Sequence, residues 1–340
     1  MGSSVQRRPL LAILLASLLT GCGYVGDPLP PALYIPLPVA DLSAMQEGGM
    51  LAVRFTLPAR TTEDLPMEGS PEVDLRAAAW EKNRQWDEAA WEREAVSLRT
   101  LPPEGSAVRA LVDATPFAAK RILVRVRVAG KLGRFSAWSE PVALEVLRRP
   151  EEIRGLTVAS APDGVQVSWT LPAQRTPGML TEVFRKPAGE KADAPFARLA
   201  GVPEDHWVDR GARFGESYLY QVRERLQRED CNYTGSLLGP LSITPVDTFP
   251  PAVPADVAVV AGATGAELSW TRNLESDFRE YRVYRSAAGG EFQPVGEPTP
   301  TPTFSDTSAP REVALRYRVT SVDEAGNESA PSSVVEVTLP

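Results

Sequence analysis

Apolar and polar residues alternate in six short segments of this chain, and each of these segments predicts a half-buried β-strand. The segments are 51–58, 124–128, 165–172, 218–222, 266–271 and 315–319. Side chains of a strand point alternately to its two faces, so a period of two places one face inward and the other outward. No amphipathic helix of note separates these segments, and glycine, proline, asparagine and aspartate mark the turns. The pattern therefore predicts an all-β chain with antiparallel sandwiches.

The same unit recurs three times along the chain. Three of these segments, 124–128, 218–222 and 315–319, each contain a residue that follows an aspartate by eleven positions. The pairs are Asp113 with Val124, Asp209 with Tyr220, and Asp306 with Tyr317. Self-similarity at a fixed spacing indicates repeated structural units. The sequence therefore predicts three versions of one β unit, each of about 90 to 115 residues.

The third unit resembles a fibronectin type III domain over its full length. It has Trp270 on the second predicted strand, the aromatic segment 281–284 on the third, and Tyr317 at the tyrosine-corner position. The second unit matches the pattern with Trp169 and Tyr220. The resemblance implies immunoglobulin-like sandwiches in tandem. We expect Trp169 and Trp270 to pack in the cores, since burying an aromatic ring removes a large apolar area from water.

The first unit departs from the pattern. Phe55 replaces the tryptophan, and Val124 replaces the corner tyrosine. The unit keeps the segment 136–141, which reads Ser-Ala-Trp-Ser-Glu-Pro and resembles a serine–tryptophan pattern of the same superfamily. We therefore expect a divergent sandwich here.

The N-terminal segment has the layout of a secretory signal. Arg7 and Arg8 precede an apolar stretch from Leu10 to Leu19, and this stretch is too short to span a bilayer. The following residues, up to Cys22, resemble the lipobox of bacterial lipoproteins. The resemblance implies cleavage before Cys22 and acyl chains on that residue, with an ordinary signal peptide as the alternative. Gly23 follows instead of an inner-membrane retention aspartate, so the resemblance implies the outer membrane, on either face.

These observations divide the chain into five parts. We expect a lipoprotein signal peptide at 1–21, a lipidated cysteine with a proline-rich tether at 22–38, a divergent sandwich at 39–148, and two further sandwiches at 151–246 and 251–340. Proline-rich segments favour extended, semi-rigid backbone. We therefore expect a stiff tether and stiff joints, and hence an elongated rod.

Charge and residue counts exclude several function classes. Removal of the leader with its two arginines leaves 34 basic side chains against 44 acidic ones, whereas a nucleic-acid binder needs a concentrated positive face. With lipid on Cys22, Cys231 is the single remaining cysteine, either an incidental loop residue or a reactive thiol. The single histidine, His206, rules out paired-histidine metal motifs, and we interpret it as a structural or surface residue. No phosphate loop or nucleophile elbow occurs. We expect no catalytic residue, no metal and no cofactor.

Two insertions distinguish the units. The first unit has about 18 to 22 extra residues between its predicted second strand and Asp113, and this region holds Trp80, Trp86 and Trp91 among charged residues. Exposed tryptophans of this kind form binding surfaces for protein or glycan. The alternative is that they cover the sandwich. The second unit has a longer loop at 228–233, which is either a contact loop or plain surface variation.

The leading hypothesis is a non-catalytic, lipid-anchored cell-envelope protein that mediates protein–protein contacts through its tandem β-sandwiches. Its expected partners are the membrane, through the N-terminal lipid, and another envelope protein, but not nucleic acid. Two alternatives stay open: a carbohydrate-binding envelope lipoprotein that uses the tryptophan cluster, and an accessory subunit of an outer-membrane assembly machine.

Overall fold

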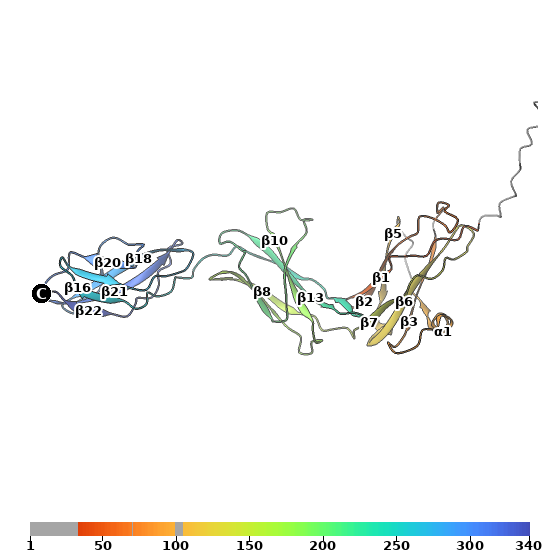
Figure 1. The fold of residues 1–340 in the computed structure, drawn as a ribbon, viewed down its shortest axis with the longest axis horizontal. Helices are drawn as coiled ribbons and strands as arrows, with labels where there is room; N and C mark the ends of the chain where they lie inside the picture. The colour runs from red at the N-terminus through yellow and green to blue at the C-terminus, as the bar shows by residue number, and fades with distance from the viewer. Residues whose placement is uncertain (1–32, 70, 99–104) are drawn as a thin grey trace, which may run out of the picture. The chain divides into compact units, whose positions relative to one another are not determined.

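The computed structural model describes residues 33–69, 71–98 and 105–340, and the regular secondary structure of these residues is almost entirely β-strand (Figure 1). They form two compact units. The first comprises the described chain up to Ala44 with Ala52–Val112 and Ile122–Ala143, and the second comprises Met45–Leu51, Asp113–Arg121 and Leu144–Pro340. The predicted signal peptide and Cys22 lie outside the described residues.

The most N-terminal strands contain the divergent repeat. They are β1 (Ser43–Glu47), β2 (Met50–Thr56), β3 (Glu72–Ala79), β4 (Val96–Ser97), β5 (Ala107–Asp113), β6 (Lys120–Ala129) and β7 (Val142–Val146). Two short helices accompany them, α1 (Glu88–Glu94) and the 3-10 turn η2 (Thr115–Phe117). One sheet has the order β4-β3-β6-β7, and β1, β2 and β5 are neighbours in another.

The middle repeat has eight strands. They are β8 (Arg154–Ala161), β9 (Gly164–Thr170), β10 (Leu180–Pro187), β11 (Ala197–Val202), β12 (His206–Asp209), β13 (Tyr218–Gln227), β14 (Asn232–Thr234) and β15 (Leu238–Ile243). One sheet has the order β12-β9-β8. The other contains β11-β10-β13, with β15 also paired to β13, and it continues through β14 to β1.

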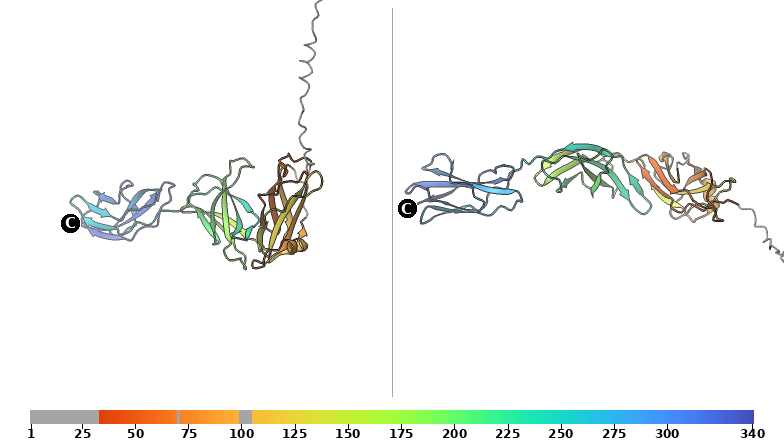
Figure 2. Two further views of the ribbon diagram at one scale, coloured as in Figure 1. Left: turned by 45° about the vertical axis from the view of Figure 1, so that its right-hand side comes forward. Right: turned by 90° about the horizontal axis from the view of Figure 1, so that it is seen from above.

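The C-terminal repeat has seven strands, drawn in blue in Figures 1 and 2. They are β16 (Ala258–Ala261), β17 (Ala266–Ser269), β18 (Phe278–Ala287), β19 (Gln293–Pro294), β20 (Thr303–Asp306), β21 (Ala314–Asp323) and β22 (Val335–Thr338). They form a three-stranded sheet, β16-β17-β20, and a four-stranded sheet, β19-β18-β21-β22.

Three strands facing four is the arrangement that all three repeats share. The divergent repeat has it in β1-β2-β5 and β4-β3-β6-β7, and the other two repeats have it in the sheets given above. Antiparallel sheets that pack face to face over apolar side chains form an immunoglobulin-like sandwich. The predicted fold class, all-β with tandem immunoglobulin-like sandwiches, is confirmed.

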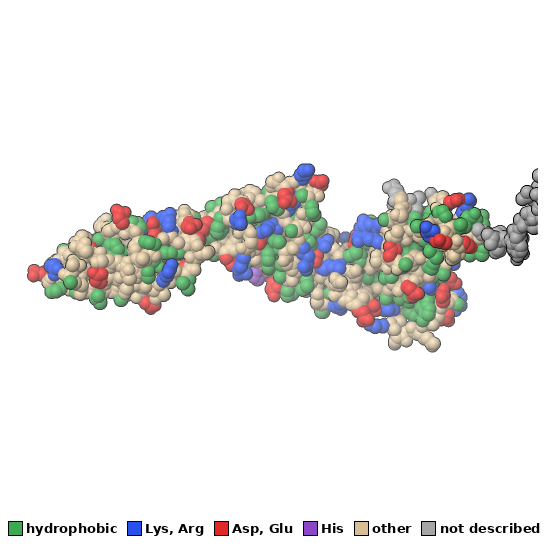
Figure 3. Space-filling view, turned by 45° about the horizontal axis from the view of Figure 1, so that its top comes forward, with side chains coloured by type: hydrophobic (Ala, Val, Ile, Leu, Met, Phe, Trp, Pro, Cys, Tyr) green, Lys and Arg blue, Asp and Glu red, His purple; other side chains and the backbone are tan. Residues whose placement is uncertain are grey.

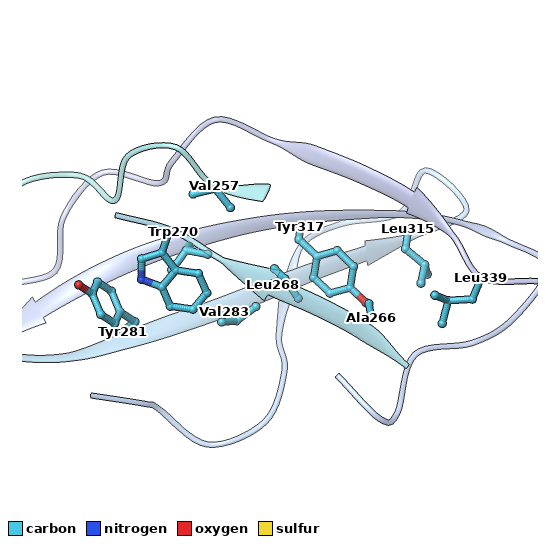
Figure 4. Packing of buried hydrophobic residues seen from close by; sticks show 10 residues of the cluster. Val257, Ala266, Leu268, Trp270, Tyr281, Val283, Leu315, Tyr317 and Leu339 are labelled. Carbon is cyan, nitrogen blue, oxygen red and sulfur yellow. The ribbon is translucent and has the colours of Figure 1, made fainter. Parts of the chain in front are cut away.

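The two tryptophans expected in the cores are buried. Trp169 is 4% exposed among the side chains between the sheets of the middle sandwich, and Trp270 is 6% exposed in the C-terminal one. Figure 4 shows Trp270 beside Tyr281 and Val283, and the two rings meet edge to face with centroids 5.0 Å apart. Such aromatic pairs add about 0.5–1.5 kcal/mol to the area they bury.

The described end of the predicted tether lies against the body. Pro36 forms a β-bridge with Thr61, and the Leu37 amide donates to the Arg60 carbonyl at 3.0 Å. Proline lacks a donor, but the residue after it still donates to a neighbouring strand. The carbonyl of Ile35 likewise accepts a bond. Residues 33–38 therefore belong to the packed structure, and the tether expected at 22–38 is shorter by at least this segment.

Among the described residues, no helix has the length and apolar character that crossing a bilayer requires. The longest α-helix of this part of the chain is α1, which has seven residues.

Candidate interaction surface

The tryptophan-rich insertion packs against one sheet of its own sandwich. Along β6, Val124 and Val126 are fully buried between the sheets, so Leu123 and Arg125 face the other side. The insertion covers that side, because Trp80 and Trp91 pack there in a buried cluster with Leu123. Sequence reasoning left helix and strand open for this region. The structure forms helix α1, and the Asp87 side chain caps its N-terminus by accepting from the Ala90 amide at 3.0 Å.

Burial separates the three tryptophans that were named as a candidate binding surface, with coverage of the sandwich as the alternative. Trp80 is 3% exposed and Trp91 is 0% exposed, whereas Trp86 is 42% exposed. For Trp80 and Trp91 the exposed binding surface is therefore wrong, and the alternative, that they cover the sandwich, is correct. Both rings cover apolar side chains on the outer face of the sheet. Removing this apolar area from water stabilises the fold, which explains why the two rings are buried. Trp86 alone of the three presents its ring to solvent.

The rings form one contiguous aromatic cluster. Trp86 lies 5.5 Å from Trp80 and 6.5 Å from Trp91, measured between centroids. Trp91 in turn meets Trp138 edge to face at 5.1 Å. The guanidinium of Arg125 lies over three of these rings, 5.3 Å from that of Trp86. Cation–π contacts of a partly desolvated arginine stabilise such an arrangement, so Trp86 has a fixed support.

Charged side chains continue the same face. Asp74 accepts from both Arg76 and Arg127, at 2.8 Å and 2.9 Å. The guanidinium of Arg127 also lies 4.3 Å from the Trp138 ring centroid, and the Trp138 indole donates to Glu92. Arginine and carboxylate groups of β3, β6 and α1 thus contact Trp138, which lies between β6 and β7. Trp138 was interpreted only as part of the segment 136–141, so its place in the cluster was missed.

Two serines fix the hairpin that carries Trp138. The Ser136 and Ser139 hydroxyls accept from the backbone amides of Val128 and Val126, at 3.2 Å and 3.1 Å. In the C-terminal sandwich, Ser329 and Ser332 make the same two bonds. They accept from the amides of Ser321 and Val319 at 3.0 Å and 2.9 Å. The shared bonds explain why serines recur three residues apart after the last long strand of both repeats.

The spacing of eleven corresponds to a hydrogen bond. The Tyr220 hydroxyl donates to the Asp209 carboxylate at 2.7 Å, and the Tyr317 hydroxyl donates to Asp306 at 2.7 Å. An arginine on the neighbouring strand donates to the same oxygen in each case, Arg185 to Asp209 and Arg285 to Asp306, both at 2.7 Å. The corner tyrosines thus bind a side chain eleven residues upstream. In the divergent repeat, Ala77 and Val124 form the corresponding cross-strand pair. Alanine thus replaces the arginine and valine replaces the tyrosine, so this repeat lacks both donors.

These buried networks shift several pKa values. Burial and the bond to Asp306 both raise the pKa of Tyr317. Burial alone would raise the pKa of Asp306, but hydrogen bonds from Ser308, Tyr317 and Arg285 outweigh it and lower that pKa. A carboxylate held by several donors keeps its charge inside the protein. The hydrogen bonds of Asp209 and Asp306 thus connect the two sheets of their sandwiches and stabilise them.

The longer loop of the middle repeat makes specific contacts. Its strand β14 pairs antiparallel with β13 and parallel with β1, where Gln46 lies opposite Tyr233. Asp230 accepts from the Arg121 guanidinium at 2.9 Å, and its carbonyl accepts from the Glu145 amide at 2.5 Å. The loop is therefore packed within the chain, and its role as a contact loop for a partner stays a prediction.

Cys231 is buried within that loop. It is 1% exposed and packs with Met179, Leu226 and Tyr233. Burial raises the pKa of its thiol, and a protonated, enclosed thiol reacts slowly. The structure supports the packing role and not the reactive one.

His206 lies on an exposed edge strand. Its Nδ1 lies 2.8 Å from the Asp205 carboxylate, and the side chain is about half exposed. Ser168 is its cross-strand neighbour, but the Ser168 hydroxyl accepts from Gln166. A nucleophilic triad needs serine bonded to histidine. The placement fits the interpretation as a surface residue.

One group of carboxylates in the described part of the chain has the spacing of a cation site. Oxygens of Asp247, Asp277 and Asp323 lie within 4.8 Å of one another. The Asn327 side chain donates to Asp323 at 2.9 Å and to Asp247 at 3.4 Å. These bonds offset part of the repulsion between the acids without a cation.

The surface charge is mixed. Figure 3 shows acidic and basic side chains interspersed over the visible face. A mixed surface favours solubility and does not attract polyanions strongly.

No family model matches the chain. Curated proteins that match in part are polysaccharide-degrading enzymes by name. Exoglucanase B of Cellulomonas fimi is 27% identical over 197 residues, which are 54% of this chain and 17% of that enzyme. Amylopullulanase of Thermoanaerobacterium saccharolyticum is 32% identical over 87 residues, 25% of this chain and 7% of the enzyme. Amylopullulanase of Thermoanaerobacter thermohydrosulfuricus is 32% identical over 145 residues, 41% and 10% of the two lengths.

The chain thus spans less than a fifth of the length of each of these relatives. Among solved structures, the FN1–FN3 domains of chicken CNTN1 cover 90% of this chain and 99% of their own, at 14% identity and a TM-score of 0.28.

Proposed function

We propose that this protein is a non-catalytic, lipid-anchored cell-envelope protein whose tandem β-sandwiches contact another protein of the envelope. The proposal that the protein is non-catalytic rests on the buried carboxylates, which are hydrogen-bonded within the fold. Asp209 and Asp306 each bind a tyrosine and an arginine of their own sandwich. Catalytic acids face a cleft and have a proton to exchange, whereas these carboxylates are fully bonded inside the fold.

The anchoring part rests on the N-terminal sequence. A basic pair, an apolar stretch and a small-residue segment precede Cys22 in the order that bacterial lipoproteins use. Each buried methylene contributes about 0.8 kcal/mol to membrane binding, so two or three acyl chains on Cys22 hold a protein stably at a membrane. Gly23 favours the outer membrane as the destination.

The contact part rests on Trp86. It is half exposed while its neighbours Trp80 and Trp91 hold it from behind, so its ring is presented in a fixed orientation. Tryptophan and arginine dominate the binding energy of protein interfaces, and a rigid side chain loses little entropy on binding. We infer that the partner contacts the insertion around Trp86.

Two measurements test the anchoring and the absence of catalysis. The mass of the mature N-terminal peptide should show Cys22 with diacylglycerol and acyl chains. A Cys22→Ser variant should move from the membrane to the soluble fraction, while a Cys231→Ser variant should stay in the membrane fraction. An unmodified Cys22, or turnover of glycan or ester substrates by the purified protein, would contradict the proposal.

A carbohydrate-binding role is the second candidate, and the names of the partial relatives favour it. An exoglucanase and amylopullulanases share part of this sequence. An exposed tryptophan also stacks well on the apolar face of a sugar ring. If this role is correct, cellohexaose or maltohexaose quenches the tryptophan fluorescence of the wild type but not that of Trp86→Ala. Absence of any change with both sugars would exclude these two ligands.

A further inference from the structure

The second compact unit contains a cavity of about 420 Å³ built from three separate segments of the chain. Its walls include the apolar side chains of Met50, Leu147 and Ala118. Arg148 and Arg149 also line it. A volume of this size suits a small organic ligand, since such pockets typically measure about 300–1,000 Å³.

A buried glutamine holds one wall in place. The Gln46 side chain is 1% exposed, and its amide accepts from the Leu147 backbone amide at 2.8 Å and donates to the Leu147 carbonyl at 3.1 Å. The same amide donates to the Gly48 carbonyl at 3.0 Å. Because the N–H and the carbonyl of Leu147 are both hydrogen-bonded, the backbone position at which Arg148 and Arg149 follow is fixed.

The segment that contributes Asp113 and Ala114 to the cavity is fixed as well. The Ala114 amide donates to the Gly49 carbonyl at 3.0 Å, which ties the second segment to the first. The Asp113 carboxylate accepts from the Thr115 amide and hydroxyl, at 3.0 Å and 2.7 Å. Asp113 therefore has donors of its own and does not depend on the arginines for a partner.

The arginines themselves lack partners within the described residues. Neither Arg148 nor Arg149 forms a hydrogen bond or an ion pair there, and both are exposed. Elsewhere in the same unit, Arg175, Arg185 and Arg285 are each paired with a carboxylate at 3.0 Å or less. The guanidinium groups of these two consecutive residues, which both line the cavity, have ten N–H donors to offer, in the planar geometry that suits carboxylate and phosphate.

We propose that this cavity binds a small organic anion, with its apolar part against Met50, Leu147 and Ala118 and its carboxylate, phosphate or sulfonate group on Arg148 and Arg149. The chemistry combines burial of apolar surface with bidentate ion pairing. This proposal does not depend on acylation of Cys22 or on the contact at Trp86. A free amphiphile and a lipid headgroup have the same chemistry, so the test separates the two sources.

The test uses the mature chain with Cys22→Ser, so that no acyl chain competes for the cavity. The probe is 8-anilino-1-naphthalenesulfonate, a fluorescent anion with an apolar body, and its binding is titrated by fluorescence. We expect one binding site. Arg148→Ala/Arg149→Ala should weaken binding at least about tenfold, since the variant removes every charge-assisted bond to the anion. Arg148→Lys/Arg149→Lys should retain part of the affinity, and Ala118→Leu should reduce it by filling the apolar wall.

Arg272→Ala is the matched control, because Arg272 lines a different pocket and should leave binding unchanged. Circular dichroism confirms that each variant is folded. Displacement of the probe by dodecyl phosphate below its micelle concentration supports a free amphiphile. Additional displacement by phosphatidylcholine vesicles that contain phosphatidylglycerol indicates a headgroup as the source. Binding that the double alanine variant leaves unchanged, or displacement by inorganic phosphate as efficient as by dodecyl phosphate, would overturn the proposal.

Discussion

The hydroxyl of Tyr317 donates to the carboxylate of Asp306 at 2.7 Å, and Tyr220 and Asp209 form the same bond in the preceding sandwich. Both partners are buried in each case. The spacing of eleven residues therefore reflects a contact that recurs in two sandwiches, between two strands of different sheets. This contact links the two layers of each sandwich through polar atoms as well as apolar ones.

Removing one hydroxyl tests the contribution of this bond. Tyr317→Phe should lower the free energy of unfolding by about 1–3 kcal/mol, because Asp306 loses a donor while it stays buried. Urea denaturation measures the change. A double-mutant cycle with Asp306→Asn should give a coupling energy of about 0.5–3 kcal/mol. Additive effects of the two changes would show that the bond contributes nothing.

The same network predicts a dependence on pH. The pKa of Asp306 is lowered in the folded state, so its ionised form stabilises the fold at pH values above its unfolded pKa, which is about 3.9. That contribution is lost as the pH falls through the folded pKa. Because Tyr317→Phe removes one of the lowering bonds, its stability deficit should shrink as the pH falls below about 4. Unfolding curves between pH 3 and 7 measure this. A deficit that is constant with pH would contradict it.

The tryptophans should differ sharply in their effect on stability. Trp91→Ala should cost about 3–5 kcal/mol, since the ring is fully buried against Leu123 and Trp138. Trp86→Ala should cost much less, because half of that ring already contacts water. Thermal and urea unfolding of the two variants checks this prediction. Equal losses would show that Trp86 is a core residue and not a presented one.

The hairpin serines offer a test with a close control. Ser332→Ala leaves the Val319 amide without its side-chain acceptor in a buried position, so it should destabilise by about 1–3 kcal/mol. Ser333→Ala, at the exposed neighbouring position, should change stability by less than about 0.5 kcal/mol. The comparison is made by urea denaturation. Similar values for both would exclude a structural role for the hydroxyl.

Cys231 should react slowly with thiol reagents in the native protein. The residue is buried and its thiol pKa is raised, so few thiolates are available to attack. In a Cys22→Ser background, labelling with a disulfide reagent should proceed at least about a hundredfold faster in denaturant than in buffer. A Cys231→Ala/Ser236→Cys variant places an exposed thiol just beyond β14 and should react quickly in both. Rapid native labelling of Cys231 would restore the reactive-thiol interpretation.

The sequence predicted the repeated sandwiches because alternation and spacing are local signals. It did not predict Arg185 and Arg285, since these arginines lie on a neighbouring strand and meet Asp209 and Asp306 only through strand pairing. The cavity could not be predicted for the same reason, because its lining residues, Gln46 among them, come from three segments that are far apart in the sequence.

The burial of the tryptophans in the insertion could not be predicted for a different reason. Three tryptophans at positions 80, 86 and 91 fit neither a helical nor a strand period, so the sequence did not indicate which rings face the sheet. Asp87 followed by Glu-Ala-Ala-Trp is a helix start with its capping residue, and this signal was available for α1. Burial of Trp80 and Trp91 depends on the uncovered outer face of β3 and β6, which only the folded sheet provides.

Photo-cross-linking in intact cells tests the central claim most directly. A benzoylphenylalanine residue is placed at position 86, and a matched control carries it at the exposed position 260 on another sandwich. The account predicts one discrete protein adduct from position 86, absent from position 260 and lost when Cys22→Ser releases the protein from the membrane. Identical adduct patterns from the two positions, or an adduct that Cys22→Ser leaves unchanged, would contradict it.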